Sequence, residues 1–279
     1  MWDWSLTPPD PVLGFRAFSE QSREGARLRQ RITGVVIALP VAALMIWAAP
    51  RLWAGQSPAP ASHPDLRGIW QAVNTADWDI QDHSAWLGVP AGRSVVEGNE
   101  IPYQPWALAK KKENYEKRDT ADPNTKCYMP GVPRITYMSF PFQIVQADDM
   151  VTILYEYVHT IRYIYTNGVP HPPGHIDWWM GDSRGHWEGN TLVVDVVDFS
   201  EDTWFDHAGN FHSDALHVVE RYTPTGADHI NYEVTIEDPK VFTRPWKMSM
   251  PLYRRQEKNM ALLEYECYAY KLEQDWAKK

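Results

Sequence analysis

The chain has 279 residues and a formal net charge of −9, and 44% of its residues are hydrophobic. This length allows one large or two modest domains, and the apolar content is sufficient for a packed core, which excludes a wholly disordered chain. The net charge is negative, and the globular part has no basic patch interleaved with aromatic residues. We therefore do not expect nucleic acid as a partner.

Residues 1–31 form a tail that contains aromatic side chains among prolines and ends in a cluster of arginines. The tail is too apolar for a simple spacer, so we expect it to bind another protein or lipid headgroups. The side chains expected to make these contacts are Trp2, Trp4, Phe15 and Phe18.

Residues 32–49 read ITGVVIALPVAALMIWAA and contain no charged side chain. Such a run is just long enough to cross the hydrocarbon core of a bilayer, so we predict a transmembrane helix over residues 32–53. Arginines are concentrated before the run, whereas Arg51 is nearly alone after it. The positive-inside rule then places the N-terminus in the cytoplasm and the rest of the chain in the periplasm of a bacterial inner membrane. The expected membrane-interface residues are Arg27, Arg29, Arg31, Trp47 and Trp53.

The alternative interpretation of the apolar run is a cleaved signal peptide, for which APA at residues 59–61 offers a cleavage site. Signal peptides have a short charged region and an apolar core of about 7 to 15 residues. The run here is longer and follows a tail of 31 residues. We therefore favour an uncleaved anchor.

Residues 54–64 form a linker rich in Pro, Ala and Ser, and a second domain is expected over residues 65–279. Short runs rich in β-branched and aromatic residues recur through this domain, separated by turn signals. They cover residues 65–74, 142–146, 150–158, 160–167, 190–199, 216–223, 229–238, 247–255 and 261–270. Because the links are short and lack the spacing of β-α-β units, we predict a mainly β fold, an antiparallel meander that forms a barrel or a sandwich.

Individual segments refine this prediction. In residues 230–237, apolar and polar side chains alternate strictly, which predicts a sheet with one face in contact with water. Residues 104–118 predict one surface helix, with Pro105 near its start. The Gly68-Ile69-Trp70 run is similar to the Gly-x-Trp of lipocalin-type (calycin) barrels, in which the Trp closes one end of the barrel; the alternative is an ordinary buried Trp.

Cys127 and Cys267 are the two cysteines, and they fit neither a zinc-site spacing nor a CxxC redox motif. Outside the cytoplasm such a pair can oxidise, so we favour a disulfide between them; two separate buried thiols are the alternative. We predict no cofactor.

Six ordered motifs, DLRGIWQ, CYMPGVPR, WWMGDSRGHWEGNTLVVDVVDF, TWFDHAGNFHSDALHVVERYT, IEDPKVFTRPW and EYEC, span residues 65–268. Together they resemble a widespread family of bacterial exported proteins for which no activity is established. The resemblance implies an exported domain and does not identify a catalytic residue. This chain departs from the family at its N-terminus, where a long tail and an anchor replace a simple signal peptide.

Polar side chains with catalytic potential crowd between residues 171 and 214. One hypothesis makes Asp182 a general base and Arg184 an anion clamp; the favoured alternative is an Asp-Ser turn followed by a hairpin at residues 188–190. Asp206 and His212 can form an acid/base pair if they face Asp182 across a barrel mouth, or can belong to a hairpin around residues 209–210.

Other charged residues are given structural roles. His171 and His175 are four residues apart, a spacing that would allow both to bind one metal ion if they lay on a helix. The prolines and the glycine between them exclude a regular helix, so no metal site is predicted. We interpret Glu220 and Arg221, and likewise the acidic pair at residues 264 and 266, as solvated or cross-strand charges.

Two functions fit these features. In the first, the chain is a single-pass membrane-anchored accessory subunit whose partners are the lipid bilayer and other subunits of an inner-membrane complex, such as a photosynthetic (reaction-centre or light-harvesting) or a respiratory complex. In the second, it is a periplasmic enzyme or small-molecule-binding protein with an aromatic pocket that uses Asp182, Arg184, Asp206 and His212. Because the tail and anchor are what this chain adds to its family, we favour the subunit.

Overall fold

A computed structural model describes residues 63–277 of the chain. The predicted tail with its aromatic contact residues, the predicted anchor with its interface residues and nearly all of the linker lie outside the described residues. Between residues 63 and 277, no helix combines the length and the hydrophobicity needed to cross a membrane.

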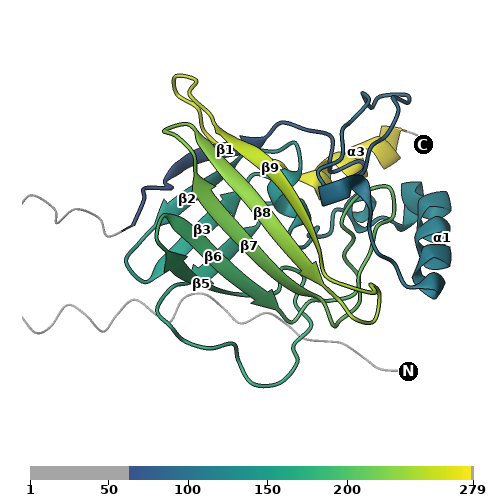
Figure 1. Ribbon diagram of the computed structural model, residues 1–279. Helices are drawn as coiled ribbons and strands as arrows, with labels where there is room; N and C mark the ends of the chain where they lie inside the picture. Colours follow the sequence, from purple (N-terminus) through teal and green to yellow (C-terminus); the bar gives the residue numbers. More distant parts are fainter. Residues whose placement is uncertain (1–62, 278–279) are drawn as a thin grey trace, which may run out of the picture. The chain divides into compact units, whose positions relative to one another are not determined.

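Nine strands of the described residues close into a barrel (Figure 1). Each strand pairs with the next along the chain, and the last strand returns to pair with the first. The pairing is antiparallel except between β4 and β5, which are parallel and joined by only two residue pairs. The prediction of a mainly β fold is confirmed, and it is a barrel rather than a sandwich. The strands are β1 Gly68–Ala72, β2 Phe142–Gln146, β3 Met150–Tyr155, β4 Ile161–Tyr165, β5 Asp182–Glu188, β6 Thr191–Val197, β7 His217–Pro224, β8 His229–Glu237 and β9 Trp246–Arg254.

The alternation predicted for residues 230–237 is confirmed on β8. Its apolar members Ile230, Tyr232, Val234 and Ile236 are all buried, and the residues between them are more exposed. Period-two alternation places one set of side chains inside a closed sheet, where they meet the inward residues of the other strands. Core side chains therefore fill the barrel interior.

The predicted surface helix is confirmed as α1, Pro105–Ala121, which lies outside the barrel (Figure 1). Three short helical turns, η1 Glu97–Asn99, η2 Pro123–Lys126 and α2 Arg134–Tyr137, occur in the connections before β2. The strand predicted at residues 261–270 is wrong, because Cys267 begins the helix α3, Cys267–Ala277. With β9 paired to β1 the sheet is closed, so no edge remains for a further strand, and the final residues form a helix instead.

Trp70 is buried where β1 meets β9. Its indole Nε1 donates a hydrogen bond to the Leu66 carbonyl at 2.8 Å, and the Arg254 guanidinium lies over the ring, 4.2 Å from its centroid. Glycine is favoured at position 68 beside it, because φ there is +136°, a backbone conformation that residues with a Cβ rarely adopt. Trp70 is thus a buried side chain at the pairing of β1 with β9.

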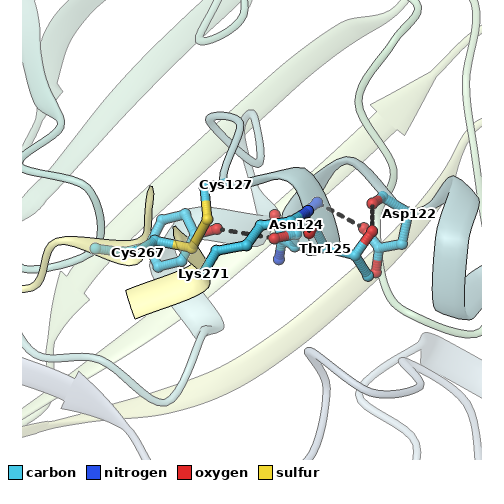
Figure 2. The surroundings of a disulfide bond; sticks show 7 residues. Asp122, Asn124, Thr125, Cys127, Cys267 and Lys271 are labelled. Carbon is cyan, nitrogen blue, oxygen red and sulfur yellow. Dashed lines mark hydrogen bonds between the residues drawn. A yellow bond between two sulfur atoms is a disulfide. The ribbon is translucent and has the colours of Figure 1, made fainter. Parts of the chain in front are cut away.

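A disulfide joins Cys127, just after η2, to Cys267 at the start of α3, with 5.6 Å between the two Cα atoms (Figure 2). The favoured bridge is therefore present, and the alternative of two thiols is excluded. Lys271 adds a second link between the same segments, since its Nζ donates to the Thr125 carbonyl at 2.8 Å. The C-terminal helix is held to the region before β2 by these contacts.

Candidate functional site

Asp182 and Arg184 lie on strand β5, so the turn predicted at this position is wrong. The strand forms because Asp182 to Glu188 pair in register with Val197 to Thr191 of β6 around the tight turn at Gly189, where φ is +58°. The hairpin predicted at residues 188–190 is thereby confirmed. Residues two apart on a strand share a face, which brings the two candidate side chains together.

The Asp182 carboxylate is fully engaged by side chains of its own chain. Arg184 donates to it with two nitrogens, Nε at 2.7 Å and Nη2 at 2.9 Å, and His171 Nδ1 lies 2.6 Å from Oδ2. The Arg184 guanidinium also lies over the Tyr165 ring, 4.8 Å from its centroid. A bidentate ion pair of this kind leaves neither a free base nor an open anion clamp.

Beside this ion pair is a cavity of about 260 Å³, at the sparse junction of β4 and β5. Tyr163, Trp178 and Met180 are among the residues that line it, together with Asp182 and Arg184. The cavity is therefore mostly apolar, and its charged groups neutralise one another.

Asp206 is completely buried and serves to hold a loop. Its carboxylate accepts hydrogen bonds from the Ile80 and Asn210 backbone nitrogens, both at 3.0 Å, and from the Asn210 side-chain Nδ2 at 2.6 Å. Burial raises the pKa of Asp206 to about 7, and the negative charge of nearby Asp79 adds to the shift. The hairpin alternative holds here, since Phe205 N donates to the Asn210 carbonyl.

This shift predicts how stability depends on pH. An unfolded aspartate titrates near 3.8, whereas Asp206 in the folded chain titrates near 7. Between these values the folded state keeps a proton that the unfolded chain has lost, so the free energy of unfolding falls as pH rises. We expect Asp206→Asn to remove this slope, on the order of 1 kcal/mol per pH unit at its steepest.

The measurement is the urea midpoint of wild type and variant at intervals from about pH 4 to pH 8. Asp214→Asn is the matched control, because the hydrogen bond from Lys240 lowers the pKa of Asp214, which places any effect of this exposed carboxylate below the window. Curves for wild type and Asp206→Asn that stay parallel throughout would contradict the assignment.

His212 is also buried, and both of its ring nitrogens are used. Nδ1 donates to the Ser213 carbonyl at 2.9 Å, so Nε2 accepts from the Thr203 hydroxyl at 2.7 Å. Burial lowers the pKa of His212, which agrees with a neutral ring. The side chain lines a larger cavity of about 670 Å³, whose lining includes neither Asp182 nor Arg184.

The four predicted site residues therefore lie in three places: Asp182 and Arg184 beside the smaller cavity, His212 at the larger one, and Asp206 in the interior away from both. The acid/base pair across a barrel mouth is not formed. His171 and His175 have different partners: His171 contacts Asp182, and His175 Nε2 lies 2.8 Å from Asp177 Oδ1. Within the described part of the chain, no cluster of three or more His, Cys, Asp or Glu side chains is arranged to hold a metal.

A buried polar network inside the barrel is the main feature that the sequence did not predict. Glu220 of β7 is fully buried, so its interpretation as a solvated charge is wrong. Both of its oxygens pair with the Arg162 guanidinium of β4, and Tyr232 donates to Oε1 at 2.6 Å. Arg162 also donates to Ser183 of β5 at 3.0 Å, which links the two strands across their sparse junction.

A second buried network is centred on Arg134 of the short helix α2. Arg134 of α2 donates to both oxygens of Asp122, at 2.8 and 2.9 Å, and to Asp77 at 2.7 Å. Although burial favours the neutral acid, Arg134 and His207 lower the pKa of Asp122 to about 2. These charges fix the connections before β2 and after β6 to one another. The motifs contain Arg134 and His207, but they did not indicate that the two side chains share the partner Asp122, since the motifs are far apart in sequence.

In the described part of the chain, fold and side chains together define a closed β-barrel with a filled, ion-paired interior, in which the candidate catalytic groups are dispersed. The chain matches no family model, and no curated protein is similar to it.

Proposed function

We propose that the protein is an accessory subunit that docks on and stabilises a larger complex of the bacterial inner membrane, anchored by residues 32–53, with the barrel in the periplasm. A photosynthetic reaction-centre or light-harvesting complex and a respiratory complex are the partners we consider. The observation that carries the proposal is an apolar stripe on the outer face of β4.

The stripe consists of Ile161, Tyr163 and Tyr165, which are 50, 49 and 37% exposed, while Arg162 and Ile164 between them are buried. Outward side chains of a strand that faces water are normally polar, so this strand is inverted relative to the usual pattern. Trp178 is exposed beside the stripe and shares the smaller cavity with all three side chains. Contiguous exposed aromatic and aliphatic side chains of this kind favour a contact with another protein.

The polar chemistry of the domain supports docking over catalysis. Asp182, Arg184, Asp206 and His212 each have partners within the chain, and they do not share one cavity. The barrel interior is filled by core residues and by the Arg162–Glu220 ion pair. A rigid, filled body with an apolar stripe on its surface is suited to stabilise an assembly.

The test is extraction of native membranes in mild detergent, followed by size separation and mass spectrometry of the chains that travel with this one. We expect co-migration with a large integral complex, lost when residues 1–31 are deleted and weakened by Tyr163→Lys in the stripe. Leu87→Lys is the matched control, because Leu87 is fully exposed and lies outside the stripe. Migration of the wild-type chain at its own mass would overturn the proposal.

A further inference from the structure

The larger cavity is a cleft between α1 and the loop that precedes β7. Its volume of about 670 Å³ lies within the range of roughly 300–1,000 Å³ that is usual for small-molecule sites. Aromatic rings form much of its wall, in two edge-to-face pairs: Trp106 with Phe211, at 6.1 Å between centroids, and Tyr128 with Trp179, at 5.1 Å. Trp204 also lines the cleft.

One face of α1 carries both an aromatic and several polar side chains into the cleft. Lys110, Asn114 and Lys117 follow Trp106 at helical spacing, and all four line the cleft. The helix is fixed at this distance by Gly209, since a Cβ there would lie 2.8 Å from the Asn114 Cβ, and by a hydrogen bond from Asn114 Nδ2 to the Gly209 carbonyl. The cleft is therefore a preformed feature and does not depend on a mobile side chain.

The charges along the cleft balance. Three lysines and three carboxylates line it, and Glu113 is held between Lys110 and Lys117, at 3.5 and 2.8 Å. A strong anion or cation would meet like charges as well as opposite ones, so the lining selects an uncharged ligand. The charged residues are Lys110, Lys117, Lys126, Glu113, Glu201 and Asp202.

Several polar groups of the cleft have hydrogen-bonding capacity left over. Within the described residues, the side chains of Lys126 and Glu201 form no hydrogen bond or ion pair. The side-chain oxygen of the buried Asn114 accepts no hydrogen bond. His212 and Thr203 satisfy each other and act as a frame. Ammonium, carboxylate and amide groups together can both donate to and accept from a ligand.

We propose that this cleft binds a neutral oligosaccharide. One face of a pyranose ring presents C–H groups that pack on an indole ring, while its hydroxyl groups both donate and accept hydrogen bonds. Exposed Trp106 and partly exposed Trp179 provide the flat surfaces, and Asn114, Lys126 and Glu201 provide the polar partners. This binding site is additional to the docking function and does not depend on it.

The test is isothermal titration calorimetry on the purified full chain, kept in a detergent without a sugar headgroup. The probes are chitotetraose, cellotetraose and maltotetraose, with trigalacturonate as the charged comparison. We expect one of the neutral sugars to bind with one site per chain. Trp106→Ala and Trp179→Ala should each weaken its affinity about tenfold or more, which corresponds to about 1.4 kcal/mol.

Trp276→Ala is the matched control, because Trp276 is an exposed tryptophan of α3 outside the cleft. It should leave the affinity unchanged. Trp106 is 55% exposed, so its removal leaves the core intact, and near-ultraviolet circular dichroism checks that each variant is folded. Absence of binding by all three neutral sugars at millimolar concentration, a preference for trigalacturonate, or unchanged affinity in both cleft variants would each overturn the proposal.

Discussion

Replacing Glu220 with alanine is expected to lower the free energy of unfolding by about 3–5 kcal/mol, because it leaves the Arg162 guanidinium buried without a counter-charge. Arg162 is 2% exposed at its side chain and Glu220 is not exposed at all, so water cannot take the place of the missing partner. The hydroxyls of Tyr222 and Tyr232, which donate to the same carboxylate oxygen, lose their acceptor as well. Urea unfolding of the full chain, followed by tryptophan fluorescence, measures the loss.

The double variant Arg162→Met with Glu220→Leu is the informative control. Replacing both charges of a buried pair by apolar side chains often leaves the free energy of unfolding unchanged or raises it. The double variant should therefore regain most of the stability lost by Glu220→Ala. A loss of less than about 1 kcal/mol for the single variant would match an exposed ion pair and would contradict the buried network. A double variant as unstable as the single one would contradict the role of the unpaired arginine.

The arrangement of the barrel could be predicted from alternation where the buried side chains are apolar. On β8 the predicted inward set is the observed one, because Ile230, Tyr232, Val234 and Ile236 gain from burial on the same face. On β4 the same reasoning gives the wrong face. There Arg162 points inward and Tyr163 outward, because Arg162 pairs with the buried Glu220. That partner is on β7, 58 residues away in sequence. No local pattern contains that partner.

Sheet closure accounts for the two strand errors. Residues 182–188 read DSRGHWE, which lacks β-branched side chains and was interpreted as a turn, yet they form β5 because β6 and β4 both offer them backbone partners. Residues 261–270 have the composition of a strand but find the barrel already closed between β9 and β1. In both cases tertiary pairing outweighs intrinsic preference.

The candidate site could also be predicted only where it depends on local sequence. The proximity of Asp182 and Arg184 follows from their spacing on a strand, and residue types alone identified both as polar groups near tryptophans. Their separation from His212 and Asp206 could not be predicted, because it depends on how the loop before β7 folds beneath α1. The larger cleft was missed for the same reason: its residues come from segments 106–128, 179 and 201–213.

Loss of the disulfide is expected to have the second large effect on stability. The bond joins residues 140 apart in sequence, and closing a loop of that length stabilises a fold by about 5 kcal/mol in the chain-entropy model. We therefore expect Cys127→Ala with Cys267→Ala to lower the free energy of unfolding by that order, measured by urea unfolding under non-reducing conditions. Addition of a reductant to the wild-type chain should approach the same midpoint and leave the variant unchanged.

Without the disulfide, the loss of structure should begin at the C-terminus, because α3 has no buried residue. Without the bridge, the contacts left to α3 include the exposed Lys271–Thr125 hydrogen bond and the exposed pair of His159 with Glu266. The segment before it keeps the part-buried bond from Leu263 N to Glu156 at 2.7 Å and the packing of Tyr265 on Tyr157. Because exposed contacts contribute little each, brief proteolysis should cut the chain near α3 in the double variant before the barrel unfolds. Lys271→Ala, which removes one such contact and keeps the bridge, should remain resistant. Equal resistance of the double variant and the wild type would show that packing alone holds α3, contrary to its exposure.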